Sequence, residues 1–292
     1  RIRASWDADE LSLYGRFDFI LAKDGTPKIL EFNADTPTSL LEASVIQWQW
    51  KEDVFPECDQ FNGIHEGLVQ SWKDIFPKKG EIYFAGALEN NEDTGTLQYL
   101  ASTAMEAGFS TRVLDMQALD LQNGRFFDPA GELVNRCFKL YPWEWMVDES
   151  PDGCLAEMEW LEPIWKLVMS NKAILATLYE LFPDSPYVLP CYLSRPRSGL
   201  FCKKPVFSRE GHNVSVVDIR NWEEHVRIAE TEGDYNTGAY VYQEYVEPTA
   251  YSGRYPVIGS WIIGGEAAGI GIRENRMEVT DNLSEFVPHI IG

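Results

Sequence analysis

Two short runs near the start of the chain alternate polar and apolar residues in the manner of β-strands. The first run, residues 16–22, places aromatic and leucine side chains on one face and Asp18 on the other. An Asp-Gly dipeptide, typical of a tight hairpin turn, precedes the second run, residues 28–33. Folding back would bring Asp18 near Glu31 and Asn33. The polar face is therefore either a solvated hairpin surface or the lining of a functional site.

A helical pattern follows the hairpin in the segment DTPTSLLEASVIQWQW. Thr36 or Thr38 can serve as the N-cap, and Pro37 suits the first helical turn. The helix N-terminus would then lie just past Asn33, where backbone N–H groups and hydroxyls suit an anionic ligand group. An ordinary capped helix explains the same pattern.

Residues from about 81 to 141 predict a separate unit of alternating strands and helix. Strand IYFAGAL is followed by helix TLQYLASTAMEAG, strand TRVLDM, a hairpin at an Asn-Gly pair and strand VNRCFKLY. The turn after the first strand reads ENNEDTG and lacks the glycine fingerprint of a dinucleotide-binding unit. Its acidic residues Glu89, Glu92 and Asp93 are either solvated charges or a cluster that faces a cationic ligand.

A basic segment, FCKKPVFSREGHNVSVVDI, predicts a strand, a loop and a second strand. Lys204 lies at the end of the first strand, and the loop contains Ser208, Arg209 and Gly211. Such a loop can place backbone amides and a lysine over a polyphosphate. Glycine-containing loops without a ligand show the same pattern, so this motif is weak by itself.

Three strand patterns, AYVYQEYVEP, YPVIGSWII and AGIGIRENR, dominate the C-terminal part of the chain. Gln243 and Tyr245 lie where the first strand leaves the core, a place suited to a hinge that contacts an adenine edge. Arg273 ends the last strand. Lys172 lies upstream, in a mostly helical region from residue 143 to 181, where most lysines are simply solvated.

Composition indicates a globular chain whose 292 residues suffice for one large domain or two to three lobes. No run of about eighteen apolar residues and no export-signal pattern is found, so we expect a cytoplasmic protein without a membrane partner. The net charge of −21 argues against a nucleic-acid partner. It suits either simple solubility or the attraction of an amine such as a polyamine.

Cysteine and histidine spacing excludes several other classes of site. The five cysteines form no CxxC pair, and the four histidines lie far apart. Neither a disulfide framework nor a zinc site is indicated. HExxH and GxSxG motifs are missing as well, which disfavours hydrolase chemistry.

Taken in order along the chain, six segments resemble the glutathionylspermidine synthase family of ATP-grasp ligases: YGRFDF, LEFNADTPTSLLEASVIQW, NKAIL, KKPVFSREG, VYQ and GIGIRE. The resemblance covers nearly the whole chain, concerns the synthetase part of the family and is closest to its stand-alone synthetase-like members. It implies an α/β (α+β) protein with a permuted ATP-grasp fold and an additional pre-ATP-grasp-like α/β lobe. The implied division is residues 1–75 for the first part of the catalytic core, 76–150 for the lobe, and 151–292 for the lid and remaining nucleotide-binding core.

The same resemblance implies ATP and Mg²⁺ as cofactors and assigns roles residue by residue. Asp18, Glu31 and Asn33 match magnesium ligands, and carboxylate and amide oxygens are hard donors suited to that ion. Arg16 and Arg273 match arginines around the reacting carboxylate. The positions implied to bind ATP are Lys172, Lys204, Ser208, Gly211, Gln243 and Tyr245. The positions implied to bind the substrates are Thr36, Thr38, Glu92, Asp93, Arg209 and Glu285.

The implied reaction is the ADP-forming ligation of a glutathione-like peptide acid to a polyamine-like amine through an acyl phosphate. Two alternatives use the same pocket: a module that binds ATP without ligating, and a phosphotransferase that stops after transfer of the γ-phosphate. The complete set of site residues argues against the binding module. The sequence leaves the oligomeric state open and permits a dimer.

Overall fold

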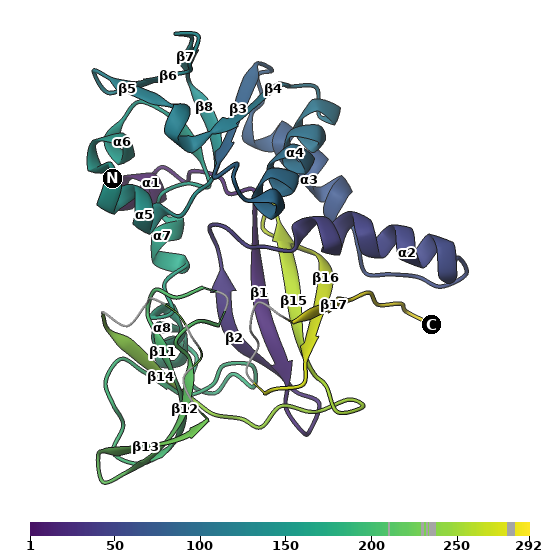
Figure 1. Ribbon diagram of the computed structural model, residues 1–292, viewed down its shortest axis with the longest axis vertical. Helices are drawn as coiled ribbons and strands as arrows, with labels where there is room; N and C mark the ends of the chain where they lie inside the picture. Colours follow the sequence, from purple (N-terminus) through teal and green to yellow (C-terminus); the bar gives the residue numbers. More distant parts are fainter. Residues whose placement is uncertain (210, 229–230, 232, 234–237, 279–283) are drawn as a thin grey trace.

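The computed structural model describes residues 1–292 except 210, 229–230, 232, 234–237 and 279–283. The described part is built in three layers (Figure 1): a parallel sheet with its helices, a central antiparallel sheet, and a second antiparallel sheet. None of the helices among these residues has the length and the apolar run needed to cross a membrane. The two antiparallel sheets together form the site described below.

The central sheet joins the two ends of the chain. Its strands run antiparallel in the order β17-β16-β15-β1-β2. The hairpin predicted from the sequence is confirmed, because β1 pairs with β2 and brings Asp18 opposite Glu31 and Arg16 opposite Asn33. Gly25, with φ of +81°, supplies the left-handed backbone of the turn. The strands are β1 (Tyr14–Leu21), β2 (Pro27–Asn33), β15 (Tyr255–Ile263), β16 (Glu266–Asn275) and β17 (Glu285–Val287).

The polar face of β1 is buried more deeply than its aromatic face. Arg16 and Asp18 are 5% and 2% exposed, whereas Phe17 and Phe19 are only half-buried. Phe17 stacks on Phe32 of β2 with ring centroids 4.0 Å apart. The interpretation of this face as a solvated hairpin surface is therefore wrong, because the face lines a cavity.

The second antiparallel sheet has the order β10-β14-β11-β12-β13 and includes the strand–loop–strand segment predicted around Lys204. Helix α8 (Ile174–Leu181) packs on it through a small cluster that contains Leu175, Cys191 and Val241. The strands are β10 (Cys191–Tyr192), β11 (Gly199–Pro205), β12 (Ser215–Arg220), β13 (Glu223–Ile228) and β14 (Tyr240–Glu244).

The parallel sheet has the order β4-β3-β8-β9, and helix α4 (Asn91–Glu106) connects β3 to β4. The Asn90 side chain caps this helix by accepting the Glu92 N–H at 2.9 Å. A small antiparallel sheet, β5-β6-β7, extends from the same layer. The strands are β3 (Glu81–Gly86), β4 (Ser110–Asp115), β5 (Asp120–Gln122), β6 (Arg125–Phe127), β7 (Leu133–Val134), β8 (Arg136–Leu140) and β9 (Glu159–Leu161).

The helix after β2 begins at Leu40 and contains the π-helical turn η1 (Glu42–Ile46) before α2 (Gln47–Val54). The predicted N-cap is wrong, because Ser39, with φ of +64°, separates Thr38 from the helix, and Thr36 bonds to Arg209 instead. The remaining helices are α1 (Ile2–Asp7), α3 (Ile64–Ile75), η2 (Met116–Ala118), α5 (Trp143–Glu149), α6 (Pro151–Leu155) and α7 (Lys166–Met169).

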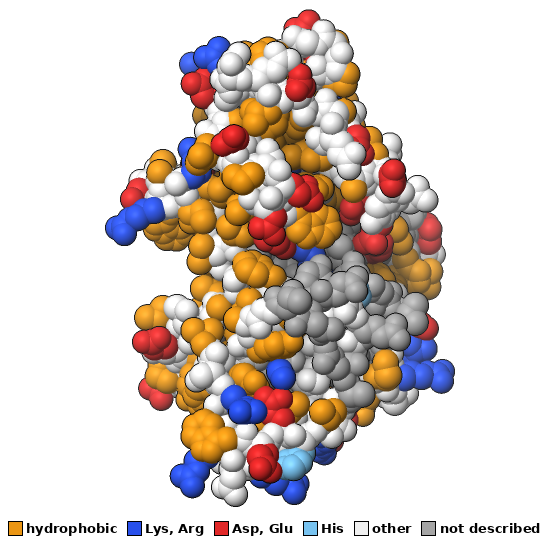
Figure 2. Space-filling model, turned by 60° about the vertical axis from the view of Figure 1, so that its left-hand side comes forward, with side chains coloured by type: hydrophobic (Ala, Val, Ile, Leu, Met, Phe, Trp, Pro, Cys, Tyr) orange, Lys and Arg blue, Asp and Glu red, His pale blue; other side chains and the backbone are white. Residues whose placement is uncertain are grey.

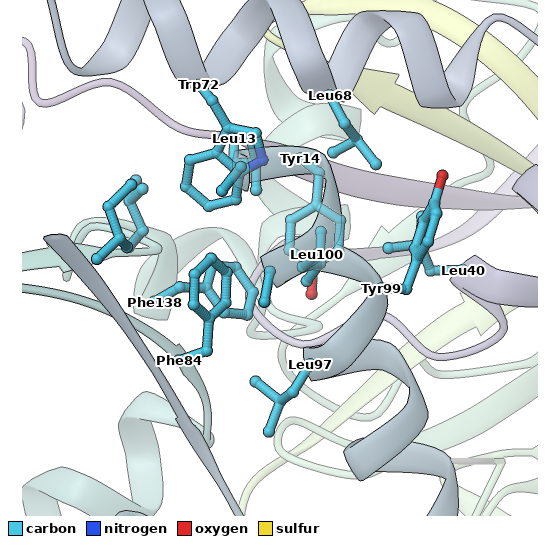
Figure 3. Packing of buried hydrophobic residues seen from close by; sticks show 14 of the residues in the cluster. Leu13, Tyr14, Leu40, Leu68, Trp72, Phe84, Leu97, Tyr99, Leu100 and Phe138 are labelled. Atoms are coloured by element: carbon cyan, nitrogen blue, oxygen red, sulfur yellow. The ribbon is translucent and has the colours of Figure 1, made fainter. Parts of the chain in front are cut away.

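The largest apolar core lies where α3 and α4 pack over the parallel sheet and the beginning of β1 (Figure 3). Trp72 of α3 is fully buried and meets Phe84 and Phe138 edge-on, with ring centroids 5.5 and 6.3 Å apart. Its indole N–H donates to Thr103 Oγ1 at 2.9 Å, so the ring is buried without an unpaired donor. Side chains of this size each stabilise the fold by about 1.5–3 kcal/mol on burial.

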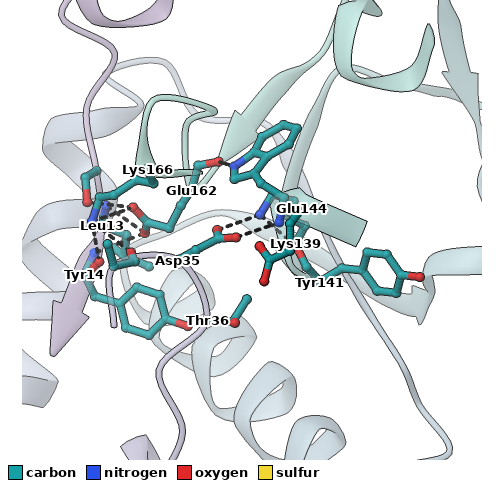
Figure 4. A network of polar contacts seen from close by, with 12 residues as sticks. Leu13, Tyr14, Asp35, Thr36, Lys139, Tyr141, Glu144, Glu162 and Lys166 are labelled. Atoms are coloured by element: carbon teal, nitrogen blue, oxygen red, sulfur yellow. Dashed lines mark hydrogen bonds and ion pairs between the residues drawn. The ribbon is translucent and has the colours of Figure 1, made fainter. Parts of the chain in front are cut away.

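A buried ion pair connects the parallel layer to the end of β2 (Figure 4). Lys139 Nζ of β8 lies 2.7 Å from Asp35 Oδ1, and neither side chain is more than 1% exposed. Asp35 Oδ2 accepts the Trp143 N–H at 2.9 Å. Burial lowers the pKa of Lys139, and Asp35 partly offsets this effect. The pair therefore fixes the backbone just after the predicted metal ligands of β2.

A second buried pair, Glu162 and Lys166, fixes the start of β1 (Figure 4). Glu162 Oε1 accepts the backbone N–H groups of Leu13 and Tyr14, each at 3.1 Å. Lys166 Nζ donates to the carbonyl oxygens of Tyr14 and Ala34 at 2.9 and 3.0 Å. Burial raises the pKa of Glu162. Both strands of the hairpin are thus positioned by charges that do not line the cavity.

Candidate active site

A cavity lies between the polar face of β1–β2 and the second antiparallel sheet. The central sheet contributes polar side chains that include Arg16, Asp18, Glu31, Asn33 and Arg273. The facing segments contribute Lys172, Lys204, Arg209, Gln243 and Tyr245, with Gly211 of the loop. Apolar side chains complete much of the lining: Ile20, Leu30, Leu189, Val214, Val246 and Val257. The cavity therefore combines a charged wall with apolar surface suited to a flat ring.

Asp18 holds two arginines in place. Arg16 Nε and Nη2 donate to the two carboxylate oxygens at 2.6 and 2.9 Å, a bidentate pair. Arg273 Nη2 of β16 donates to Asp18 Oδ2 at 3.1 Å. Burial alone lowers the pKa of Arg16, but Asp18 outweighs that effect and raises it. Both guanidinium groups are therefore oriented toward one point of the cavity wall by the same carboxylate.

Gly259 of β15 makes room for this arrangement. It lies opposite Asp18 in the sheet, and a Cβ at this position would lie 2.7 Å from Arg16 Cδ. Any larger residue would displace the arginine. A glycine inside a strand is a known sign of close approach by another group, so the sequence contained this signal.

Glu31 and Asn33 extend the charged wall along β2. Lys172 Nζ lies 2.8 Å from Glu31 Oε2. Asn33 Nδ2 lies 3.2 Å from Glu31 Oε1 and 3.3 Å from Asp18 Oδ2. Burial would raise the pKa of Glu31, but the charge and hydrogen bond of Lys172, with help from Lys204, lower it to about 2. Glu31 is therefore ionised at neutral pH.

These three side chains suit a divalent cation. Carboxylate oxygens are the hard donors that Mg²⁺ prefers, and Asn33 already contacts both acids. The nitrogen and oxygen of an amide exchange places by a half-turn, which would direct Asn33 Oδ1 toward the same point. Among the described residues, no group of three or more His, Cys, Asp or Glu side chains could hold a metal ion. The amide oxygen is thus the natural third donor.

We expect the Glu31–Lys172 pair to make stability depend on pH. The pKa of Glu31 falls from its ordinary 4.5 to about 2 on folding, so its contribution is complete above about pH 4.5 and is lost as pH falls toward 2. Glu31→Gln should lower the free energy of unfolding by roughly 2 kcal/mol at pH 7. Urea unfolding of both proteins at pH 7 and pH 3 checks this. An undiminished difference at pH 3 would contradict it.

Lys204 and Gln243 join the second sheet to β2. Lys204 Nζ donates to Gln243 Oε1 at 2.7 Å and to the Leu30 carbonyl at 3.0 Å. Gln243 Nε2 donates to the Ile29 carbonyl at 2.8 Å. Burial lowers the pKa of Lys204. Both residues lie in the cavity where the sequence predicted nucleotide contacts, and they are almost fully buried.

The loop after β11 closes over the charged wall. Its Ser208 carbonyl accepts a hydrogen bond from Lys172 Nζ at 2.6 Å. Arg209 reaches across the cavity, where Nη1 donates to Thr36 Oγ1 at 2.5 Å and Nη2 pairs with Glu144 Oε1 of α5 at 2.5 Å. The loop is thereby attached to the parallel layer. Glu144 was not predicted from the sequence, since the helix that carries it shows no motif.

Three predicted substrate residues lie outside this cavity lining. Glu92 and Asp93 are in the first turn of α4, although the charge of Glu92 contributes to the raised pKa of Arg16. Glu285 of β17 is exposed and pairs with Arg254 at 2.7 Å. Their roles as substrate ligands stay predictions. Thr38, by contrast, lines the cavity, and its carbonyl accepts a hydrogen bond from Arg16.

Two further lining residues, Glu278 and Cys202, were not predicted. The Tyr245 hydroxyl donates to Glu278, and burial raises the pKa of this tyrosine. Cys202 lies two positions before Lys204 on β11. Strand alternation places both on the same face, so Cys202 was within reach of sequence reasoning. Glu278 lies beyond the last predicted strand pattern and had no such signal.

Comparison with known proteins identifies relatives along the whole chain. A family model described as "Glutathionylspermidine synthase preATP-grasp" matches residues 1–292. A Haemophilus influenzae protein named "Putative acid--amine ligase" is 39% identical over 99% of this chain and 77% of its own length. The bifunctional glutathionylspermidine synthetase/amidase of Escherichia coli is 26% identical over 100% of this chain. The chain spans only 51% of that bifunctional protein.

Solved structures support the fold independently. A Methylobacillus flagellatus protein titled "Putative gamma-glutamylcysteine synthetase" superposes with a TM-score of 0.66 at 10% identity. The match covers 99% of this chain and 82% of the other. This likeness concerns the mixed α/β fold alone. The match of the family model to every residue, together with the Haemophilus relative, shows that the chain belongs to the glutathionylspermidine synthase family.

Proposed function

We propose that the protein is an ATP-dependent, ADP-forming ligase that joins a glutathione-like peptide acid to a polyamine-like amine. One observation carries the proposal: a single cavity with apolar walls brings together the two arginines held by Asp18, the proposed metal ligands Asp18, Glu31 and Asn33, and the lysines Lys172 and Lys204. Such a set can hold a triphosphate, a divalent cation and a reacting carboxylate together. The homology to acid–amine ligases agrees with it.

The finer description of the fold belongs to the same proposal. The hairpin with the proposed metal ligands precedes both Lys172 and the strand β11 that bears Lys204, which is the order of a permuted ATP-grasp protein. We assign residues 1–75 to the first part of the catalytic core and 76–150 to a pre-ATP-grasp-like lobe. Residues 151–292 then form the lid and the remaining nucleotide-binding core, apart from β9, which completes the parallel sheet.

The chemistry explains why ATP is needed. A carboxylate and an amine do not condense in water, because the carboxylate is a poor electrophile and oxide is not a leaving group. Attack of a carboxylate oxygen on the γ-phosphorus breaks its bond to the bridging oxygen and yields an acyl phosphate and ADP. A neutral amine then attacks the acyl carbon, and the tetrahedral intermediate expels phosphate and loses a proton to give the amide.

The residues of the cavity divide this work. Arg16 and Arg273 stabilise the transferring phosphoryl group and the tetrahedral oxyanion. Lys172 can exchange Glu31 for a phosphate oxygen, and Lys204 holds a second phosphate. Asp18, Glu31 and Asn33 are the residues that would hold Mg²⁺, which when bound supplies positive charge that shields the phosphates. The apolar residues described above suit the adenine ring.

The decisive experiment measures ADP release from Mg·ATP by the purified protein, with small peptides, including glutathione, tested against polyamines and amino acids. ADP that requires both an acid and an amine supports the ligase and names its substrates. ADP released with an acid alone indicates a phosphotransferase. Tight ATP binding without ADP release from any pair favours a nucleotide-binding module.

Arg273→Ala should slow ADP release by roughly 10²- to 10³-fold, the usual cost of deleting one donor to a developing negative charge. Arg273 contacts Asp18 from β16, whereas Arg276 lies exposed just past the end of the same strand. Arg276→Ala therefore serves as the matched control and should keep close to full activity. Equal rates for the two variants would remove Arg273 from the catalytic group.

A further inference from the structure

A second, smaller chamber adjoins the active-site cavity and shares Asn33, Thr36 and Arg209 with it. The end of β2, the loop after β11 and two helices of the parallel layer meet here. Glu144 comes from α5, and Ser170 directly follows α7. The rest of the lining consists of Ala34, Asp35, Phe207 and Ser208.

Two side-chain oxygen atoms in this chamber are buried without a hydrogen-bond partner among the described residues: Glu144 Oε2 and Ser170 Oγ. The other oxygen of Glu144 binds Arg209 Nη2 at 2.5 Å. A buried carboxylate oxygen that accepts no hydrogen bond costs free energy, so such atoms in native proteins usually meet a ligand or water. Both atoms can accept a hydrogen bond, which indicates a donor ligand.

The two unpartnered oxygens, more than the net charge of the chamber, favour an ammonium group as that donor. Asp35 is matched by Lys139 at 2.7 Å. Glu144 is paired with Arg209. The negative charge of Glu144 also acts to raise the pKa of Lys139, which Figure 4 shows close to it. An ammonium group carries several N–H donors and could serve Glu144 Oε2 and Ser170 Oγ together. A neutral donor could also bond to Glu144 Oε2, but Arg209 would then be the only cation that balances the charge of this carboxylate.

We propose that the chamber binds an ammonium group of a substrate at Glu144 Oε2 and Ser170 Oγ, and that this binding loosens the Glu144–Arg209 pair. A second cation on the same carboxylate repels the guanidinium, because like charges at short range in a poorly solvated site interact strongly. Arg209 then turns toward anionic groups in the main cavity. Glu144 would thus both bind a substrate nitrogen and, on binding it, release Arg209 of the loop after β11.

The ammonium group has two chemical sources under the proposed function on which this inference rests. It belongs either to the amine substrate or to the N-terminus of the peptide acid. Glu144 acts the same way in both cases. Figure 2 shows hydrophobic side chains interspersed with charged ones on one face of the molecule, between its upper and lower parts.

Isothermal titration calorimetry of the full chain tests the inference without relying on turnover. Spermidine, glutathione and N-acetylglutathione serve as probes, with Mg²⁺ and a non-hydrolysable ATP analogue present. Glu144→Gln should weaken binding of spermidine or of glutathione by about tenfold or more, the worth of a charge-assisted hydrogen bond. Glu149→Gln, an exposed position on the same helix, is the matched control and should change neither affinity.

The probes separate the two sources. Weaker binding of spermidine by Glu144→Gln assigns the chamber to the amine substrate. Weaker binding of glutathione, with N-acetylglutathione unaffected, assigns it to the peptide N-terminus. Ser170→Ala should weaken the same probe by a smaller factor. The inference is overturned if Glu144→Gln binds every probe as the unaltered protein does, or if the unaltered protein binds none. A protein that fails the ADP assay but shows the Glu144 effect would overturn only the proposed reaction.

Discussion

Asp18→Asn should lower the rate of ADP release by at least roughly 10³-fold, more than the loss of a single oxyanion donor. Asp18 accepts hydrogen bonds from Arg16, Arg273 and Asn33 at 2.6–3.3 Å. The substitution keeps the size of the side chain but removes the charge that orients both guanidinium groups. It also removes one of the two carboxylates suited to Mg²⁺. Steady-state ADP release at saturating ATP measures the effect.

Asp24→Asn provides the matched control for this result. Asp24 lies in the turn of the same hairpin, is exposed, and accepts the Thr26 N–H at 2.9 Å. Its substitution should leave the rate within about twofold, as surface changes usually do. Circular dichroism shows whether both variants fold. More than about a tenth of normal activity in folded Asp18→Asn would be incompatible with its assigned role.

Lys139→Met should destabilise the protein by about 3–5 kcal/mol, the usual cost of removing one partner of a buried ion pair. The substitution leaves the Asp35 carboxylate, which is 1% exposed, without its countercharge at 2.7 Å. Asp35 still accepts the Trp143 N–H, but one hydrogen bond does not replace an ammonium group. Chemical denaturation followed by tryptophan fluorescence measures the loss.

The double variant Asp35→Asn with Lys139→Met separates charge from packing. Replacing both charges should recover a large part of the loss, because no unpaired charge then remains buried at this pair. Lys78→Met, at an exposed position of the same layer, should change stability by less than about 0.5 kcal/mol. A Lys139→Met protein as stable as the Lys78 control would show that the pair contributes little.

Local patterns were sufficient to predict the hairpin of β1 and β2, but not the shift in register between Asp18 and Phe19. Alternation and an Asp-Gly turn specify which residues face each other, so Asp18, Glu31 and Asn33 could be placed together from the amino-acid sequence alone. The lysine strand followed from the same kind of pattern. Gathering all these residues into one cavity required the resemblance to a family, because the strands concerned are far apart in the chain.

Long-range contacts explain what the sequence did not reveal. Burial of the polar face of β1 depends on residues from 172 to 278 that cover it, and no local pattern encodes them. Glu144 is connected to the site by its bond to Arg209, which lies 65 positions away in the chain. The pairs Asp35–Lys139 and Glu162–Lys166 look in sequence like ordinary surface charges. Their burial follows from how the layers meet.

The place of β1 within the central sheet also orders events during synthesis. Its two neighbours are β2, made immediately afterwards, and β15, made some 240 residues later. The parallel sheet and the second antiparallel sheet are each nearly contiguous in the chain, so their strands can pair while translation continues. The hairpin with Asp18 and Glu31 must wait, unpaired along one edge, until residues 255–263 leave the ribosome. The cavity is therefore completed only after all three layers have been synthesised, and a shorter nascent chain cannot assemble it.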